Sequence, residues 1–210
     1  MFIRQRTFVE EQGLVTLEHH INAEDGRCFH FVAYACDDDG NEVPIGSLRV
    51  LPPPNEPRPH DGSVILHSVK EGEDSIPSGE VLFGKMVEED IEKRERQWEE
   101  RRPTDMWDGK EWFLHFARMC VLPEWRGRGV ADLLVKRACE WAEGEFEEGF
   151  ECGKARWNGL LLANAREEAR RMWERNGFVE DKGMGRWNEV GVELFAVCRR
   201  MKMKKVEVEG

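Results

Sequence analysis

The segment from Trp112 to Trp141 constrains the fold most, because it joins an apolar strand, a glycine-bearing loop and an amphipathic helix. Residues 112–121 include eight apolar residues out of ten, which predicts a strand that is buried on both faces. Pro123 ends that strand. After the loop, apolar side chains recur at helical spacing: Val130, Leu133, Leu134, Ala138 and Trp141. This order predicts a strand–loop–helix unit at the centre of an α/β protein.

The loop between the strand and the helix has the chemistry of a phosphate cradle. Glycine lets the backbone approach a ligand closely, and a helix N-terminus offers unsatisfied N–H donors and partial positive charge. Arginine adds full charge and can bind phosphate through two hydrogen bonds. The candidate cofactor-binding residues are Arg126, Gly127, Arg128, Gly129, Val130 and Ala131. The alternative is an ordinary strand–turn–helix connection with cationic turn residues.

Two familiar phosphate loops do not match. No Lys-Ser/Thr pair follows the glycines, as a P-loop requires, and position 132 is aspartate where the Rossmann spacing needs glycine. The order Arg-x-x-Gly-x-Ala, after a strand that ends in Met119-Cys120-Val121-Leu122-Pro123, resembles the acetyl-CoA loop of the GNAT superfamily of N-acetyltransferases. The resemblance implies the α/β GNAT (acyl-CoA N-acyltransferase) fold, a mixed, mostly antiparallel sheet with a splayed central strand pair and helices on both faces.

Two further strings carry the resemblance. Residues 4–12, Arg-Gln-Arg-Thr-Phe-Val-Glu-Glu-Gln, resemble the end of the first helix in an ElaA-like or fungal branch, with Thr7 where that pattern has valine. Residues 175–178, Arg-Asn-Gly-Phe, resemble the family ending Tyr-x-x-x-Gly-Phe. GNAT domains usually begin with a strand before the first helix. The chain leaves almost no room for one, so we expect a truncated start or a dispensable strand.

Composition limits the remaining choices. The length of 210 residues suits a single GNAT domain over 1–210, with a charged, Pro/Gly-rich insertion at about 52–110. The net charge of −11 argues against nucleic acid as a partner, and no apolar run approaches the ~18 residues of a membrane span. Six cysteines lack CxxC or zinc spacing. We therefore expect no metal and a reducing compartment, the cytoplasm or alternatively the nucleus.

Periodicity and turn residues predict the other elements. These are a helix over 3–12, hairpin strands over 29–36 and 43–51, a charged helix over 85–102, a strand over 155–163 parallel to the central one, a helix over 166–176, and closing strands over 178–183 and 192–202. The charged helix is either a solvated surface helix or a lid over the acceptor site. We expect His19 and His20 to be surface or packing residues, since neighbours on a helix point in different directions.

The resemblance also assigns cofactor-binding residues. It implies that the backbone of Met119, Cys120 and Val121 holds the pantetheine arm and the thioester carbonyl, and that the 126–131 loop holds the pyrophosphate. Asn164 could bind the pantetheine arm. This match is loose, because the family's asparagine usually lies two positions later, where this chain has Arg166.

The catalytic groups are less clearly marked. The family's usual general acid is a tyrosine four residues before the glycine of Gly-Phe, and this chain has Trp173 there. An indole N–H donates a hydrogen bond but is not an acid at working pH, and a core aromatic is the alternative role. His115 is the candidate base, with a reference pKa of ~6.5, or else a buried structural histidine. Arg118, if buried, needs a partner, an acidic group of the substrate or of the protein.

The resemblance implies an enzyme that transfers an acetyl group from acetyl-CoA directly to a primary amine, on a small molecule or a peptide. The acidic net charge favours a cationic acceptor. Two other classes stay open. One is a non-catalytic acyl-CoA-binding module, favoured by the missing tyrosine, and the other is an interaction protein on the same scaffold. The sequence identifies neither the acceptor nor the oligomeric state, and a homodimer is one option.

Overall fold

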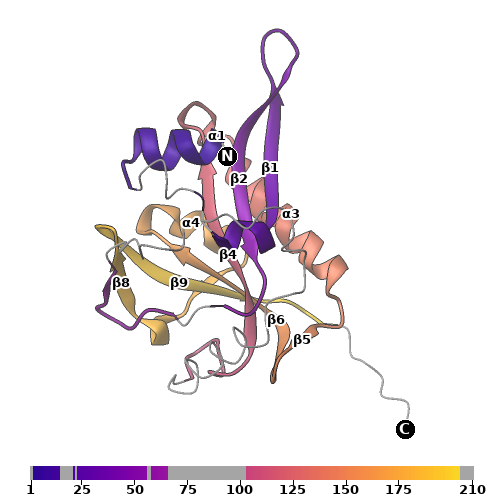
Figure 1. The fold of residues 1–210 in the computed structure, drawn as a ribbon, viewed down its shortest axis with the longest axis vertical. Helices are drawn as coiled ribbons and strands as arrows, with labels where there is room; N and C mark the ends of the chain where they lie inside the picture. Colours follow the sequence, from indigo (N-terminus) through magenta and orange to yellow (C-terminus); the bar gives the residue numbers. More distant parts are fainter. Residues whose placement is uncertain (1, 15–20, 22, 56–57, 66–102, 204–210) are drawn as a thin grey trace.

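The computed structural model describes residues 2–14, 21, 23–55, 58–65 and 103–203, which form one mixed sheet with helices (Figure 1). The described strands are β1 (Phe29–Cys36), β2 (Glu42–Leu51), β3 (Val64–Ile65), β4 (Trp112–Val121), β5 (Phe150–Cys152), β6 (Ala155–Ala165), β7 (Val179–Glu180), β8 (Arg186–Glu189) and β9 (Val192–Arg200). Their order is β1-β2-β4-β6-β9-β8-β3, with β5 paired to β6 and β7 paired to β9. Of these pairs, β4–β6 and β3–β8 are parallel and the others are antiparallel.

Helices cover both faces of the sheet. They are α1 (Phe2–Arg4), which continues as π-helical turns over Gln5–Glu11, α3 (Val130–Glu145) and α4 (Arg170–Arg175). Adjacent residues of a strand point to opposite faces. At the end of β4, Cys120 packs in a small cluster with Ile3 of α1, whereas Val121 belongs to the main core with Val130 of α3. The N-terminal helix and α3 therefore lie on opposite faces of β4.

The first half of β4 and its parallel partner β6 form the centre of the core. Trp112 and Phe113 of β4 and Trp157 of β6 are almost completely buried, as are residues 160–163. The predicted burial of the central strand on both faces is confirmed for this half. Between His115 and Met119 only Phe116 is fully buried, because this part of the strand borders a cavity.

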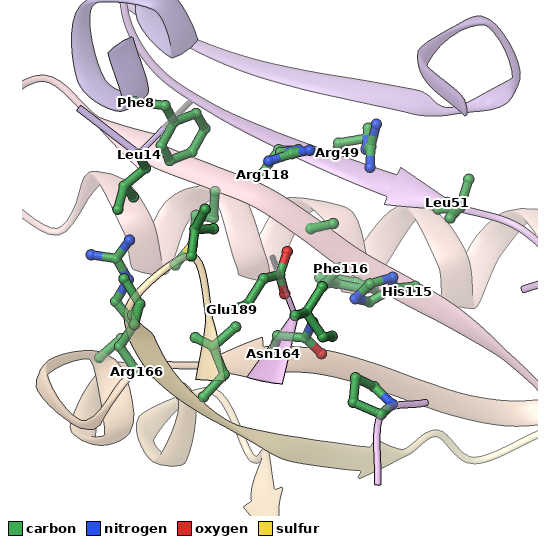
Figure 2. Close-up of a pocket in the computed structure, with 18 of the residues that line it drawn as sticks. Phe8, Leu14, Arg49, Leu51, His115, Phe116, Arg118, Asn164, Arg166 and Glu189 are labelled. Carbon is green, nitrogen blue, oxygen red and sulfur yellow. The ribbon is translucent and has the colours of Figure 1, made fainter. Parts of the chain in front are cut away.

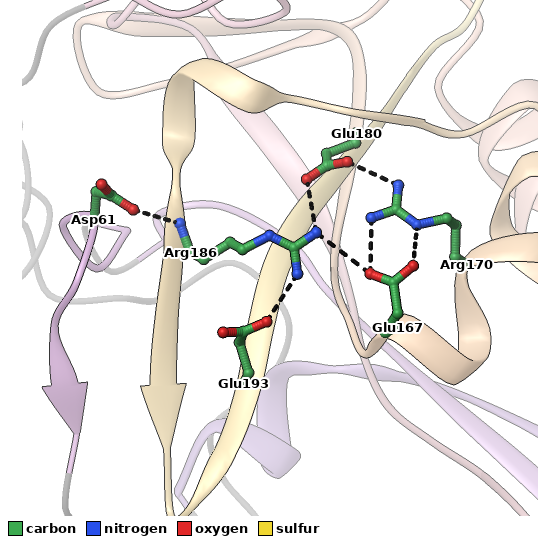
Figure 3. A network of polar contacts seen from close by, with 6 residues as sticks. All are labelled: Asp61, Glu167, Arg170, Glu180, Arg186 and Glu193. Carbon is green, nitrogen blue, oxygen red and sulfur yellow. Dashed lines mark hydrogen bonds and ion pairs between the residues drawn. The ribbon is translucent and has the colours of Figure 1, made fainter.

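A network of charged side chains joins α4 to the closing strands (Figure 3). It consists of Glu167, Arg170, Glu180, Arg186 and Glu193. Arg170 donates hydrogen bonds to Glu167 at 2.6 Å and to Glu180 at 2.7 Å. The bond from Arg170 lowers the pKa of Glu167 to about 2. Asp61 accepts a hydrogen bond from the backbone N–H of Arg186 at 2.7 Å. The network thus holds α4 close to β8 and β9.

Most of the predicted elements are present, including the hairpin, the parallel strand and the first helix. Three short strands were not predicted: β3, β5 and β8. Strands of two to four residues are too short to show a periodic pattern. The predicted 85–102 helix and the His19–His20 pair lie outside the described residues. None of the described helices is long and apolar enough to cross a membrane.

The described ends of the predicted insertion pack into the domain. Trp107 is part of the main core and donates its indole N–H to the carbonyl of Glu111 at 2.8 Å. Arg58 is also buried. Asp181 accepts a hydrogen bond from the Thr104 hydroxyl at 2.5 Å. Residues near both ends of the segment therefore contribute to the same structural unit as the sheet.

The packing of α3 on β2 depends on Gly46, which leads to our first prediction. A Cβ atom at position 46 would lie 2.9 Å from Cγ1 of Val130 and 3.2 Å from Cδ1 of Leu134. Gly46→Ala should therefore lower the free energy of unfolding by about 1–3 kcal/mol, as overpacking does. Gly144→Ala is the matched control, because Gly144 is exposed on α3 with open space around it.

The control should raise the free energy of unfolding by roughly 0.5–1 kcal/mol, since alanine favours a helix over glycine. Chemical denaturation of both variants measures the two changes. Equal effects of the two substitutions would contradict the proposed close packing of α3 on β2.

Candidate active site

β4 and β6 separate halfway along β4. β6 pairs with β4 as far as Phe116↔Ala163, whereas β2 stays paired with β4 as far as Val121. Among the described strands, none pairs with residues 117–121 on the β6 side. Residues 164–165 of β6 pair with β9 and not with β4. The sheet consequently has an open strand edge in its interior.

A β-bulge in β4 accompanies this separation. Ala117 is paired with Arg49 and Cys120 with Ser47, so β4 has one residue more than β2 over this interval. Arg118 lies inside the interval and takes a φ of +52°, which is rare for a residue with a long side chain. A bulge bends its strand and re-aims side chains. It therefore gives a local reason why the two central strands diverge here.

A cavity of about 520 Å³ lies along the open edge (Figure 2). Five consecutive residues of β4, 115–119, line it. Alternating side chains of a strand could not all face one cavity, so part of this wall is the strand edge itself. Asn164, Arg166 and Trp173 line the cavity from β6 and the segment that follows it. The volume is in the usual range of small-molecule sites.

His115 lies on the cavity wall where β4 and β6 are still paired. Its Nε2 atom is buried and has no hydrogen-bond partner among the described residues. Burial lowers the pKa of His115 well below the usual 6.5, and the charges of Arg58 and Arg49 lower it further. The imidazole is therefore neutral at neutral pH, with an unused ring nitrogen beside the cavity.

Trp173 and Asn164 lie on the other side of the opening. Trp173 is buried on α4, with its ring centroid 4.9 Å from that of Phe178. It thus packs as a core aromatic and also lines the cavity. Asn164 accepts a hydrogen bond from Arg58 through Oδ1. That contact occupies an acceptor of the side chain that we expected to face the pantetheine arm.

The three residues at the end of β4 face different surroundings. Met119 lines the cavity, whereas Cys120 packs toward α1 and Val121 toward α3. The Cys120 thiol lies 3.4 Å from the Ser47 hydroxyl, and burial raises its pKa. Cys120 is therefore protonated at neutral pH, unlike an activated cysteine nucleophile. Because the three side chains have different surroundings, the groups that these residues can all present toward the gap are backbone N–H and C=O groups.

The 126–131 loop lies after β4, outside the cavity wall, and opens α3. Gly127 and Gly129 have φ values of +71° and +80°, in the region that favours glycine. A Cβ atom at either position would have open space around it. Among the described residues, no backbone acceptor receives a hydrogen bond from the N–H groups of residues 127–129. The loop therefore presents free donors to solvent at the start of a 16-residue helix.

The two arginines of this loop already have protein partners. Both terminal nitrogens of Arg126 donate hydrogen bonds to the carboxylate of Glu11, each at 2.6 Å. Its Nε donates a hydrogen bond to the carbonyl of Val121 at 3.0 Å. The bond to Arg126 lowers the pKa of Glu11. Arg128 lies over the ring of Trp125, at 5.0 Å from its centroid. The free donors of the loop are thus backbone groups rather than the Arg126 guanidinium.

Four charged residues of the cavity wall were not noticed in the sequence: Glu24, Arg49, Arg58 and Glu189. Arg49 could have been noticed, because a cation inside an otherwise apolar strand pattern signals a buried charge. Arg58 and Glu189 lie in segments without periodicity, and only the fold brings them to the cavity. Figure 2 shows Glu189 across the cavity from Arg118 and Arg49.

Comparisons with known proteins agree with this geometry. Residues 95–180 match the family model of the acetyltransferase (GNAT) domain. A solved structure of a candidate N-acetyltransferase from Lactobacillus plantarum matches with a TM-score of 0.53 and 18% identity, over 95% of this chain and 86% of the other. No protein with a curated description matches the chain in sequence.

Two further structures match less closely, each with a TM-score of 0.49. An acyl-CoA N-acyltransferase from Pseudomonas aeruginosa is 15% identical, over 94% of this chain and 85% of the other. ElaA of Escherichia coli is 13% identical, over 95% and 86%. These scores do not distinguish one branch from another. The chain has the GNAT fold of acyl-CoA N-acyltransferases, and its residues 95–180 match the model of the acetyltransferase (GNAT) domain.

Proposed function

We propose that the protein is an N-acetyltransferase that uses acetyl-CoA and acetylates a primary amine by direct transfer. The observation that carries the proposal is the open interior edge of β4 over residues 117–121, with a cavity along it. When bound, acetyl-CoA supplies an activated acetyl thioester, and direct transfer to the amine nitrogen forms an amide and frees the CoA thiol. The proton that the neutral amine loses balances the proton that the thiol gains.

The open edge suits the pantetheine arm. Unpaired backbone N–H and C=O groups in a protein interior need partners, and an extended ligand with amide groups can pair with such an edge as an added strand would. We propose that the backbone of Met119, Cys120 and Val121 makes these bonds and polarises the thioester carbonyl. Asn164, beside the gap on β6, would contact the arm after exchanging its bond with Arg58.

The loop suits the pyrophosphate. Free N–H groups at the start of a helix bind phosphate oxygens, and residues 127–129 present such groups. The glycines leave room for a ligand against the backbone. Since Arg126 is paired with Glu11, the proposal gives the main role to the backbone of residues 127–131 and to Arg128. Arg126 shapes the loop and can exchange partners.

His115 and Trp173 are the proposed catalytic side chains. His115 is neutral and has a free, buried Nε2, so it can accept a proton from the attacking amine. Trp173 lines the cavity, and its indole can donate a hydrogen bond toward the leaving sulfur but no proton. The chain's one tyrosine, Tyr34, is exposed on β1 and does not line this cavity. The proton on the released thiol would then come from another group or from water.

The absence of a tyrosine from the cavity favours one second candidate, a non-catalytic acyl-CoA-binding module. The two candidates, an N-acetyltransferase and a non-catalytic module, are distinguished by measuring thiol release from acetyl-CoA in the presence of a panel of amines. Such a module would bind acetyl-CoA without releasing thiol.

Three finer assignments are part of the proposal. The string at 4–12 supports an ElaA-like branch. The packed ends of the 52–110 segment support a single domain with an insertion. All six cysteines are free thiols, which supports a reducing compartment such as the cytoplasm.

A substitution in the loop tests where acetyl-CoA binds. Gly129→Glu should weaken acetyl-CoA binding by about 100-fold or more, because a carboxylate would face the phosphates at the helix start. Gly129→Gln is the matched control, with the same backbone strain and no charge, and should lose much less. Calorimetric titration measures both affinities. Equal affinities of the wild type and the Glu variant would place the cofactor elsewhere.

The lowered pKa of His115 predicts a pH dependence. Between the pKa of folded His115 and about 6.5, the unfolded chain binds the extra proton and the folded protein does not. The free energy of unfolding should therefore fall as the pH drops below about 6.5 and should not depend on His115 above it. Denaturation at several pH values measures this, and His115→Gln should remove that part of the dependence.

The same lowered pKa applies to activity. If His115 is the base, kcat should fall on the acid side only below pH 6.5, and His115→Gln should lower kcat by about 100-fold or more. An acid limb at 6.5 or above that disappears in His115→Gln would contradict the neutral buried state. An unchanged kcat in the variant would make His115 a structural residue.

A further inference from the structure

Arg118 is a charged residue at the open edge for which the proposed transfer has no use. It is partly buried and lines the cavity. Among the described residues, no carboxylate lies within ion-pair distance of its guanidinium, and it makes no side-chain hydrogen bond. Burial lowers the pKa of Arg118 to about 10, and the neighbouring charge of Arg49 contributes. A partly buried cation that has no counter-ion among the described residues is less stable than a paired one, so this position favours an anionic ligand.

Two acids, Asp25 and Glu189, raise the pKa of Arg118 through their charge, but neither is its counter-ion. Asp25 is bound by Arg4 at 2.7 and 3.1 Å and by Arg49 at 3.0 Å. Glu189 raises the pKa of Arg118 but forms no ion pair with it. The anion that completes the site therefore does not come from these two residues.

The described wall of the cavity is more basic than the chain as a whole. Its charged residues are Arg49, Arg58, Arg118, Arg166, Glu24 and Glu189. Four arginines against two glutamates give a formal charge of +2, whereas the whole chain carries −11. The buried Nε2 of His115 also has no hydrogen-bond partner within the described residues. The described cavity wall is thus positively charged although the chain as a whole is negatively charged, and it favours an anionic group.

The backbone around Arg118 also indicates a functional position. At a φ of +52°, arginine is strained where glycine or asparagine would be tolerated. The bulge places this strained residue beside the gap, and Figure 2 shows its guanidinium close to that of Arg49 on one side of the cavity. Two like charges side by side repel each other, and among the described residues Arg118 has no counter-ion that would offset this repulsion.

We propose that Arg118 binds a carboxylate of the acceptor, so that the acceptor is a free amino acid. The inference rests on the proposed acetyl transfer. A guanidinium matches a carboxylate through two parallel hydrogen bonds. Arg118 directly precedes Met119, whose backbone lies on the open edge, so the carboxylate would be held a few bonds from the amine that attacks. The carboxylate is bound but takes no part in bond formation.

Matched acceptors test the proposal. Thiol release from acetyl-CoA is measured with each of the twenty standard amino acids and with the carboxamide of each, which keeps the amine and removes the negative charge. The wild type should prefer at least one amino acid over its carboxamide by about 100-fold in kcat/KM. Arg118→Gln should lose that preference, mainly through KM. Arg118→Lys should keep part of it, because an ammonium retains the charge but not the fork.

Two controls separate binding from folding. Arg137→Gln removes an exposed arginine of α3, whose side chain is paired with Glu140, and should leave the preference unchanged. Arg118→Gln should not lower the thermal unfolding temperature, because it removes a partly buried charge that has no counter-ion in the described part of the chain. A lowered unfolding temperature with an unchanged preference would give Arg118 a structural role and overturn the proposal.

The outcome for the acceptor class is independent of the outcome for the cofactor. Equal rates with acids and carboxamides, a preference for peptide amines, or no amino acid acceptor at all would overturn the amino acid assignment if acetyl-CoA binds. A wild-type protein that does not bind acetyl-CoA in a titration of the same preparation would overturn the proposed function itself. The two failures are therefore distinguishable.

Discussion

The bulge in β4 is the constraint on which the functional half of the structure depends. One extra residue between Ala117 and Cys120 keeps β4 paired with β2 while its pairing with β6 stops at Phe116. The result is a strand edge inside the sheet, where unpaired backbone groups are costly unless a ligand or water satisfies them. The strained φ of Arg118 belongs to the same feature. The backbone strain, the open edge and the cavity thus all accompany the one extra residue in the β4 bulge.

Around this edge, the protein separates three tasks by position. The buried halves of β4 and β6 supply the rigid core, the 126–131 loop presents backbone donors at the start of α3, and the cavity wall supplies charge. The pairing of Arg126 with Glu11 connects the loop to the N-terminal helix. The charged network around Arg170 fixes α4, and Trp173 with it, against the closing strands. Elements that are far apart in sequence therefore fix the geometry of the cavity along the open edge of β4.

Much of this arrangement could be predicted from local patterns. The run of apolar residues before Pro123, the glycine spacing and the helical period after it indicated the strand–loop–helix unit, and parallel pairing followed from the helical crossover. The cavity wall could not be predicted in the same way. Glu189 reaches it through a four-residue strand, Arg58 through a segment without periodicity, and the occupied state of Arg126 depends on Glu11, 115 positions away. Long-range contacts of this kind leave no mark in a single sequence.

The most direct test of the account is amide hydrogen exchange over β4 with and without acetyl-CoA. If the open edge receives the pantetheine arm, acetyl-CoA should slow exchange at those amides of residues 117–121 that face β6 and at residues 127–131 of the loop. Amides of the buried half, 112–116, should change little, because β6 already pairs with them. Saturating acetyl-CoA that protects neither the edge nor the loop would contradict the account.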